Sequence, residues 1–126
     1  MIRVNVYNYN IVEMIKNPTI DFVILPTGYV LTNQKELDEQ LEDVFYQLNW
    51  SNWTKEKPKE VHSTIDSCGS GVILNIDGSK EFYLSMSVGW KKFDTFRDLY
   101  EWVKRNWKDP VAMFKDLGEI TFDIKE

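Results

Sequence analysis

Residues 71–88 read GVILNIDGSKEFYLSMSV, two apolar runs that meet at the turn-forming pair Asp77-Gly78. Such a pair between alternating apolar runs is a strong signal for a β-hairpin. A two-residue loop would place the two apolar rows on opposite faces. A three-residue loop over 76–78, with Gly78 in the left-handed conformation, sets Val72 beside Phe82 and keeps both rows on one face. We therefore expect a bulged hairpin with one apolar face.

Regular patterns on either side of this hairpin complete the order of elements. Alternating runs predict strands at 2–7 and 120–124, apolar runs predict strands at 22–25 and 29–31 around a turn at 26–28, and a weak pattern indicates a strand at 60–66. Capping residues and 3.6-residue periodicity predict helices at 11–15, 34–48, 96–107 and 110–117, the third capped by Asp94 or Thr95. The 49–59 segment is a polar connector. We expect an α+β fold with one domain over 1–126 and a largely antiparallel sheet with helices packed on one face.

The helix at 34–48 has the clearest pattern in the first half of the chain. Asn33 is its predicted cap, and Glu36 completes a capping box. Its apolar residues repeat with helical spacing, so they form a stripe that faces the core: Leu37, Leu41, Val44, Phe45 and Leu48. The acidic residues between them are expected to face water.

Charge is distributed unevenly along this chain of net charge −5. Residues 34–48 hold five acidic side chains against Lys35 alone, whereas residues 90–108 hold six basic and three acidic side chains. The overall acidic balance argues against direct binding of nucleic acid, because that affinity comes mainly from neutralised phosphates. The start of the chain lacks the apolar core of a signal peptide, and no run reaches membrane-spanning length. We expect a cytoplasmic protein with no membrane association.

Residues with catalytic chemistry are few. His62, Asp66 and the single cysteine, Cys68, have the types needed for a base, an orienting carboxylate and a nucleophile, but no family signature surrounds them. One cysteine and one histidine leave too few ligands for a zinc site. Gly69-Ser70-Gly71 precedes a strand rather than a helix, unlike a phosphate-binding loop. We therefore expect no enzyme activity, no metal and no cofactor.

An acidic helix face followed by two tryptophans is the best candidate for a functional surface. The candidate partner-binding residues are Glu36, Asp38, Glu39, Glu42, Asp43, Trp50 and Trp53. Clustered carboxylates accelerate association with a basic surface, and tryptophan is enriched among the residues that dominate binding energy. The alternative is that the carboxylates form an ordinary solvated face and that the tryptophans are core residues over the sheet edge.

Several short segments carry a family resemblance. The order of Ile73–Ile76, Asp77-Gly78, Glu81–Leu84, a helix ending at Trp107 and Glu119-Ile120-Thr121 resembles small acidic anti-CRISPR proteins of phages that inhibit type II effectors. The front half, with Val6-Tyr7-Asn8-Tyr9, Leu25-Pro26-Thr27 and an acidic helix, is similar to anti-restriction proteins. This chain is less acidic than those proteins. The resemblance implies a protein that occupies a nucleic-acid-binding groove as a charge competitor.

Three non-catalytic functions remain as hypotheses, beside the alternative of an enzyme that uses Cys68. The first is a non-catalytic inhibitor from a phage or mobile element that binds a basic nuclease or other defence protein, acting as a monomer or homodimer. The second is an immunity protein that neutralises a toxin, which would need a similar acidic surface. The third is a nucleotide-sequestering module, in which an aromatic ring stacks on the base and cations meet the phosphates. Its candidate residues are Tyr83, Trp90, Lys91, Lys92 and Arg105.

Overall fold

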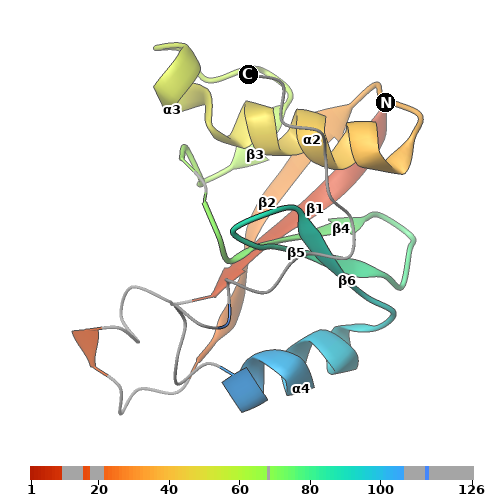
Figure 1. The fold of residues 1–126 in the computed structure, drawn as a ribbon. Helices are drawn as coiled ribbons and strands as arrows, with labels where there is room; N and C mark the ends of the chain where they lie inside the picture. The colour runs from red at the N-terminus through yellow and green to blue at the C-terminus, as the bar shows by residue number, and fades with distance from the viewer. Residues whose placement is uncertain (10–15, 18–21, 68, 107–112, 114–126) are drawn as a thin grey trace.

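One antiparallel sheet runs through the molecule (Figure 1). The computed structural model describes residues 1–9, 16–17, 22–67, 69–106 and 113, and its strand order is β3-β2-β1-β4-β5-β6. The strands are β1 (Ile2–Tyr9), β2 (Ile24–Thr32), β3 (Val61–Ser63), β4 (Val72–Ile76), β5 (Phe82–Ser85) and β6 (Trp90–Phe93). The helices are α2 (Leu37–Leu48), α3 (Trp50–Trp53) and α4 (Phe96–Asn106). The predicted α+β class with a largely antiparallel sheet is confirmed.

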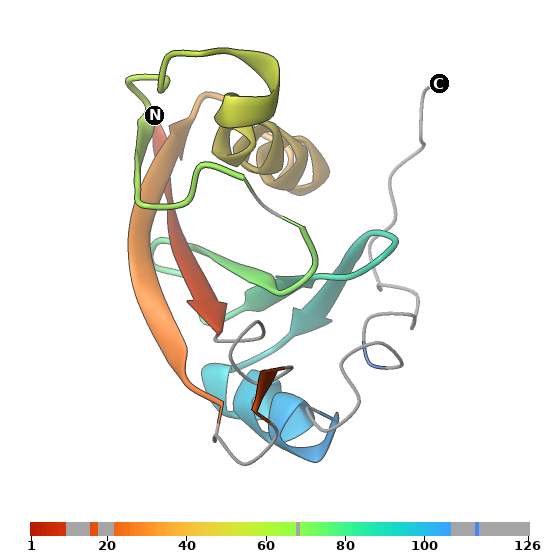
Figure 2. The same ribbon diagram turned by 90° about the vertical axis from the view of Figure 1, so that its left-hand side faces the viewer.

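The sheet is buried on both faces in its β4–β6 half. Leu74 and Tyr83 belong to a core cluster with α2, whereas their neighbours Ile73 and Leu84 belong to a second cluster with α4. Successive strand residues point to opposite faces, so the two helices cover opposite sides. Figure 2 shows β4, β5 and β6 between α2 and α4. The helices were expected on one face of the sheet. α2 lies on one face, and α4 lies on the opposite face.

The hairpin of β4 and β5 has a different register from the predicted one. Ile73 pairs with Leu84 and Leu74 with Tyr83, so Val72 does not lie beside Phe82. Gly78 has a φ of 88°, as expected, and the Ser79 N–H donates to the Ile76 carbonyl at 2.8 Å. The Asn75 side chain donates to the carbonyls of Ser79 and Glu81 at 2.9 and 2.8 Å, so it holds a longer connection. Both faces of this hairpin can be apolar because α2 covers one and α4 covers the other.

β2 passes straight through the predicted turn at 26–28. Val6 pairs with Gly28 and Tyr7 with Pro26, so Thr27 is an extra residue that forms a bulge. The Thr27 hydroxyl donates to the Val6 carbonyl at 3.1 Å. β3 pairs with β2 only over Gly28–Val30, so Pro26 takes no place in that ladder. The residues at 26–28, which were expected to reverse the chain, instead form a bulge within β2.

The β6 strand was missed, whereas α4 was predicted. Trp90–Phe93 pairs with β5 instead of leading into the helix as a loop. α4 begins after Thr95, whose side chain accepts the Asp98 N–H at 3.2 Å, as one of the two predicted caps. The weakly patterned 60–66 segment contains β3. The helices expected at 11–15 and 110–117 and the strand at 120–124 lie outside the described residues, except Met113, which is helical and buried.

No helix in the described part of the chain is long and apolar enough to span a membrane.

Candidate functional site

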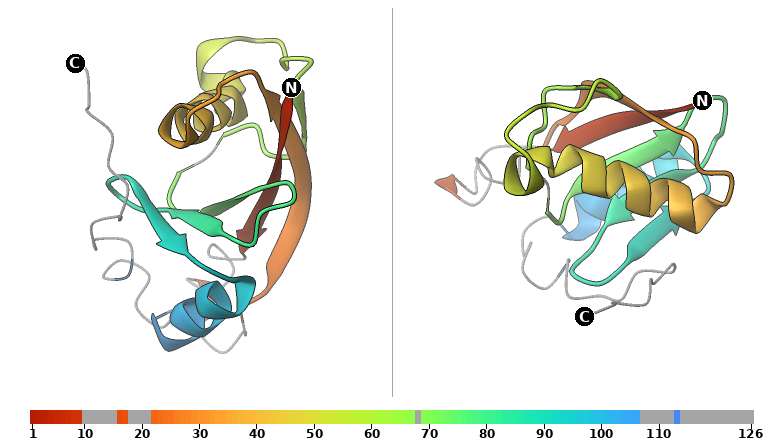
Figure 3. Two further views of the ribbon diagram at one scale, coloured as in Figure 1. Left: turned by 90° about the vertical axis from the view of Figure 1, so that its right-hand side faces the viewer. Right: turned by 90° about the horizontal axis from the view of Figure 1, so that it is seen from above.

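α2 presents a polar face directly opposite the stripe that holds it on the sheet. Leu41, Val44 and Leu48 are fully buried, as the periodicity predicts. The helix turns 100° per residue, so Glu39, Glu42 and Tyr46 fall on the side away from this stripe. Figure 3 shows the helix lying across the strands, with α3 directly after its end. The predicted Asn33 capping box is wrong, because the helix starts at Leu37 and the N-cap residue Glu36 makes no side-chain capping bond.

Four of the five candidate carboxylates are exposed and unpaired. These are Glu36, Asp38, Glu39 and Glu42. The ion pair found among the described residues joins Lys92 on β6 to Glu81, just before β5, at 3.4 Å, and neither residue belongs to α2. The negative charge of α2 is therefore not neutralised by any described basic side chain, and it faces solvent.

Asp43 has a structural role that the sequence did not indicate. Its carboxylate accepts the Thr32 hydroxyl at 2.6 Å and the Gln47 amide at 3.0 Å. Gln47 also donates to the Leu31 carbonyl at 3.2 Å. These bonds tie α2 to the end of β2, and Asp43 is only half exposed. We therefore assign Asp43 to holding the helix in place rather than to the open contact surface.

The two tryptophans take different positions. Trp53, 63% exposed, stacks on Tyr46, 56% exposed, with ring centroids 5.6 Å apart and planes 22° apart. Trp50 is partly buried against the α2-side core, and its indole nitrogen is buried without a hydrogen-bond partner. The 49–59 connector begins with the short helix α3, in which both the N–H and the hydroxyl of Ser51 donate to the Asp66 carbonyl. Trp53 is therefore a surface residue, and Trp50 is largely a core residue.

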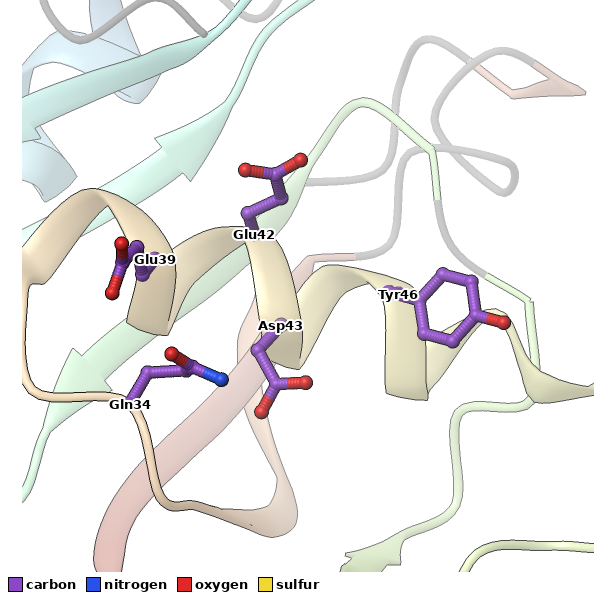
Figure 4. A pocket seen from close by; sticks show the side chains of 5 residues that line it. All are labelled: Gln34, Glu39, Glu42, Asp43 and Tyr46. Carbon is purple, nitrogen blue, oxygen red and sulfur yellow. The ribbon is translucent and has the colours of Figure 1, made fainter. Parts of the chain in front are cut away.

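Hollows run side by side across α2. One of about 380 Å³ is lined by Gln34, Glu39, Glu42, Asp43 and Tyr46 (Figure 4). A second of about 320 Å³ shares Gln34, Asp43 and Tyr46 and extends toward Pro58 and Glu60. A third of about 200 Å³ shares Glu42 and lies against the β5–β6 hairpin. Figure 4 shows the Glu42 carboxylate on the side of the helix away from Asp43. The shared residues make the first hollow a neighbour of each of the other two.

Tyr46 and Gln34 were missed by the sequence reasoning. Tyr46 lies four residues after Glu42 and seven after Glu39, a spacing that places all three on one helix face. That spacing was available in the sequence as a signal. Gln34 precedes the helix, and only the three-dimensional path of the chain brings it beside Asp43. We define the α2 contact surface as Glu39, Glu42, Tyr46 and Trp53, with Glu36 and Asp38 at its edge.

The residues proposed to stack on a nucleotide base are not accessible. Tyr83 is 1% exposed and Trp90 3% exposed. Burial and the bond from its hydroxyl to Glu81 at 2.7 Å raise the pKa of Tyr83. That bond, and then the nearby Lys92, lower the pKa of Glu81. The Tyr83 hydroxyl is therefore bonded within the protein, and neither ring is open to a ligand. Base stacking on Tyr83 or Trp90, as the nucleotide hypothesis requires, is contradicted.

Of the three residues with catalytic potential, the structure describes His62 and Asp66. His62 is exposed, and its ring stacks on Tyr29 with centroids 4.6 Å apart. Cys68 lies outside the described residues. Within the described ranges, no group of three or more His, Cys, Asp or Glu side chains is arranged to hold a metal ion.

Comparisons of this chain with protein-family models, with curated proteins and with solved structures find no match.

Proposed function

We propose that this protein is a non-catalytic inhibitor from a phage or mobile element. It would bind a basic, nucleic-acid-binding groove of a bacterial nuclease or defence protein through the α2 contact surface. The observation that carries the proposal is the stacked, exposed pair Tyr46 and Trp53 beside the unpaired carboxylates Glu39 and Glu42.

This combination of groups suits a cationic protein surface. Unpaired carboxylates attract basic side chains over a distance, so they raise the rate of encounter and disfavour acidic partners. Aromatic rings then bind the same cations through their faces and exclude water from the contact. Stacking of Trp53 on Tyr46 restricts both rings before binding, which lowers the conformational entropy lost on association.

The proposal is tested in bacteria that carry a nuclease-based defence system. Expression of the protein should raise the transformation efficiency of a plasmid that the system targets. The double substitution Glu39→Lys/Glu42→Lys should abolish this effect without lowering the melting temperature, because both side chains are exposed and unpaired. The matched control is Asp94→Lys/Glu101→Lys, which changes the net charge equally at exposed positions before and on α4.

The control should leave protection of the plasmid intact. Full protection by the Glu39→Lys/Glu42→Lys protein would show that the α2 contact surface does not bind the defence protein. Equal loss of protection in both double variants would show that net charge, rather than this surface, is responsible.

A further inference from the structure

The smallest of the three hollows has three apolar side chains and one acidic side chain in its lining. It lies between α2 and the β5–β6 hairpin and has a volume of about 200 Å³. Phe45 and Trp90 form one wall, with ring centroids 5.8 Å apart and planes 88° apart. Met86, itself buried, adds a flexible apolar side chain. Glu42 is the charged residue in the lining.

The walls of this hollow are already held in place. The Met86 N–H donates to the Gly89 carbonyl at 3.0 Å, which closes the tight turn between β5 and β6. The Ser85 hydroxyl accepts the Val72 N–H at 3.0 Å and donates to the Gly69 carbonyl at 2.7 Å. Because Ser85 is satisfied within the protein, Glu42 is left as the strongest polar group for an incoming ligand. A preorganised site of this kind loses little entropy on binding.

Size and chemistry favour a side chain over a small molecule. Pockets for drug-sized ligands measure about 300–1,000 Å³, so this hollow is better matched to one long side chain. Its lining requires an apolar stem and a cationic end. Arginine meets both needs better than lysine, because guanidinium is more weakly hydrated, stacks on aromatic rings and forms paired hydrogen bonds with a carboxylate.

We propose that this hollow receives a single arginine side chain from the basic partner. Its aliphatic stem packs mainly against Phe45, the least buried of the three apolar lining residues, and its guanidinium pairs with Glu42. The inference rests on the proposed function, since it assigns the partner residue that the α2 contact surface recognises. Glu42 also lines the hollow that contains Tyr46, so the bound arginine would fix the position of the partner along the helix.

The test is a titration of the isotope-labelled full chain followed by nuclear magnetic resonance. Acetyl-arginine amide should shift the backbone signals of Ser87 and Gly89 and the indole signal of Trp90, saturating with a Kd on the order of 1 mM. Acetyl-citrulline amide, which lacks the charge, should bind at least about 3-fold more weakly. The same is expected of Nα-acetyl-lysine amide, which keeps a charged ammonium but has no guanidinium.

Two variants that remove a carboxylate charge and one that fills the hollow separate specific binding from general attraction. Glu42→Gln should weaken arginine binding about 3-fold or more, whereas Glu36→Gln, which removes the same charge from a residue outside the three hollows, should not. Ser87→Tyr, which fills the mouth, should abolish the shifts. Unchanged signals from β1 show that each variant is folded.

The outcomes distinguish this inference from the proposed function. Equal shifts with citrulline, or equal losses in Glu36→Gln and Glu42→Gln, overturn the arginine site. An absence of shifts together with intact plasmid protection overturns the arginine site alone. Arginine shifts together with an absence of plasmid protection leave the hollow as an arginine site and overturn the inhibitor role.

Discussion

The contact between Glu81 and Tyr83 joins an exposed carboxylate to a buried phenol. Tyr83 donates to Glu81 at 2.7 Å, and Lys92 lies 3.4 Å from the same carboxylate group. Hydrogen bonding to the ionised form lowers the pKa of Glu81 below its ordinary value of 4.5. A lowered pKa contributes stability that is present above the ordinary value and is lost as the pH falls through the folded-state value.

This contact gives a prediction at the scale of single residues. In Tyr83→Phe the main cause of the shift is gone, so the pKa of Glu81 should rise toward its ordinary value. The measurement is a carboxyl titration of Glu81 by nuclear magnetic resonance. Lys92→Gln is the matched variant, and it should raise the pKa of Glu81 less, because the phenol bond is the largest single cause of the lowered pKa. A larger effect of Lys92→Gln would mean that the ion pair dominates instead.

At the scale of elements, the bulge in β2 decides whether β3 can pair. Gly28 has a φ of 121°, and a Cβ at this position would lie 2.0 Å from the carbonyl oxygen of His62 on β3. Gly28→Ala should therefore destabilise the protein by about 2–4 kcal/mol, from the left-handed backbone and the displaced strand together. Urea unfolding measures this change.

Gly78 provides the control for the bulge. Its φ is 88°, but a Cβ there would have no neighbour within 4 Å. Gly78→Ala should cost about 1 kcal/mol, from backbone conformation alone. Equal costs at the two glycines would show that the approach of β3 to Gly28 contributes nothing to stability.

Local pattern predicted the elements whose burial follows a simple period. The stripe of α2, the alternation of β1 and the Thr95 cap of α4 were all readable, because each depends on neighbouring residues. The path of β2 was not readable, because Pro26-Thr27-Gly28 has the composition of a turn and only its partners make it a bulge. The hairpin register was misassigned because one buried face was assumed, and α4 supplies a second.

The candidate site was predictable to the same extent. The helical period correctly placed Glu39 and Glu42 on the exposed face of α2. The period could not show that Asp43 turns toward Thr32, or that α3 directs Trp53 to the surface and Trp50 toward the core. Those positions depend on contacts between segments far apart in the sequence.

For the whole molecule, the important feature is the difference in charge between α2 and α4. α2 carries only acidic charged side chains, whereas α4 carries the exposed Arg97, Lys104 and Arg105 together with two acidic residues, and the two helices lie on opposite sides of β4–β6 (Figure 2). Such a charge distribution orients the molecule in the field of a basic partner, so that α2 approaches first. The carboxylates should therefore act mainly on the association rate, and the aromatic pair mainly on the dissociation rate.

That division can be measured on the purified defence nuclease whose inhibition the plasmid assay detects. Glu39→Lys/Glu42→Lys should lower the association rate constant roughly 10-fold at low salt and weaken its salt dependence, because it removes the attraction that guides encounter. Trp53→Ala should leave the association rate within about 2-fold and raise the dissociation rate roughly 30-fold, as expected for an aromatic residue at the centre of a contact. Asp94→Lys/Glu101→Lys should change neither rate constant as strongly, since those side chains are on the α4 side. If Trp53→Ala dissociates as slowly as the unmodified protein, the stacked rings lie outside the interface, and the carboxylates alone would have to bind the partner.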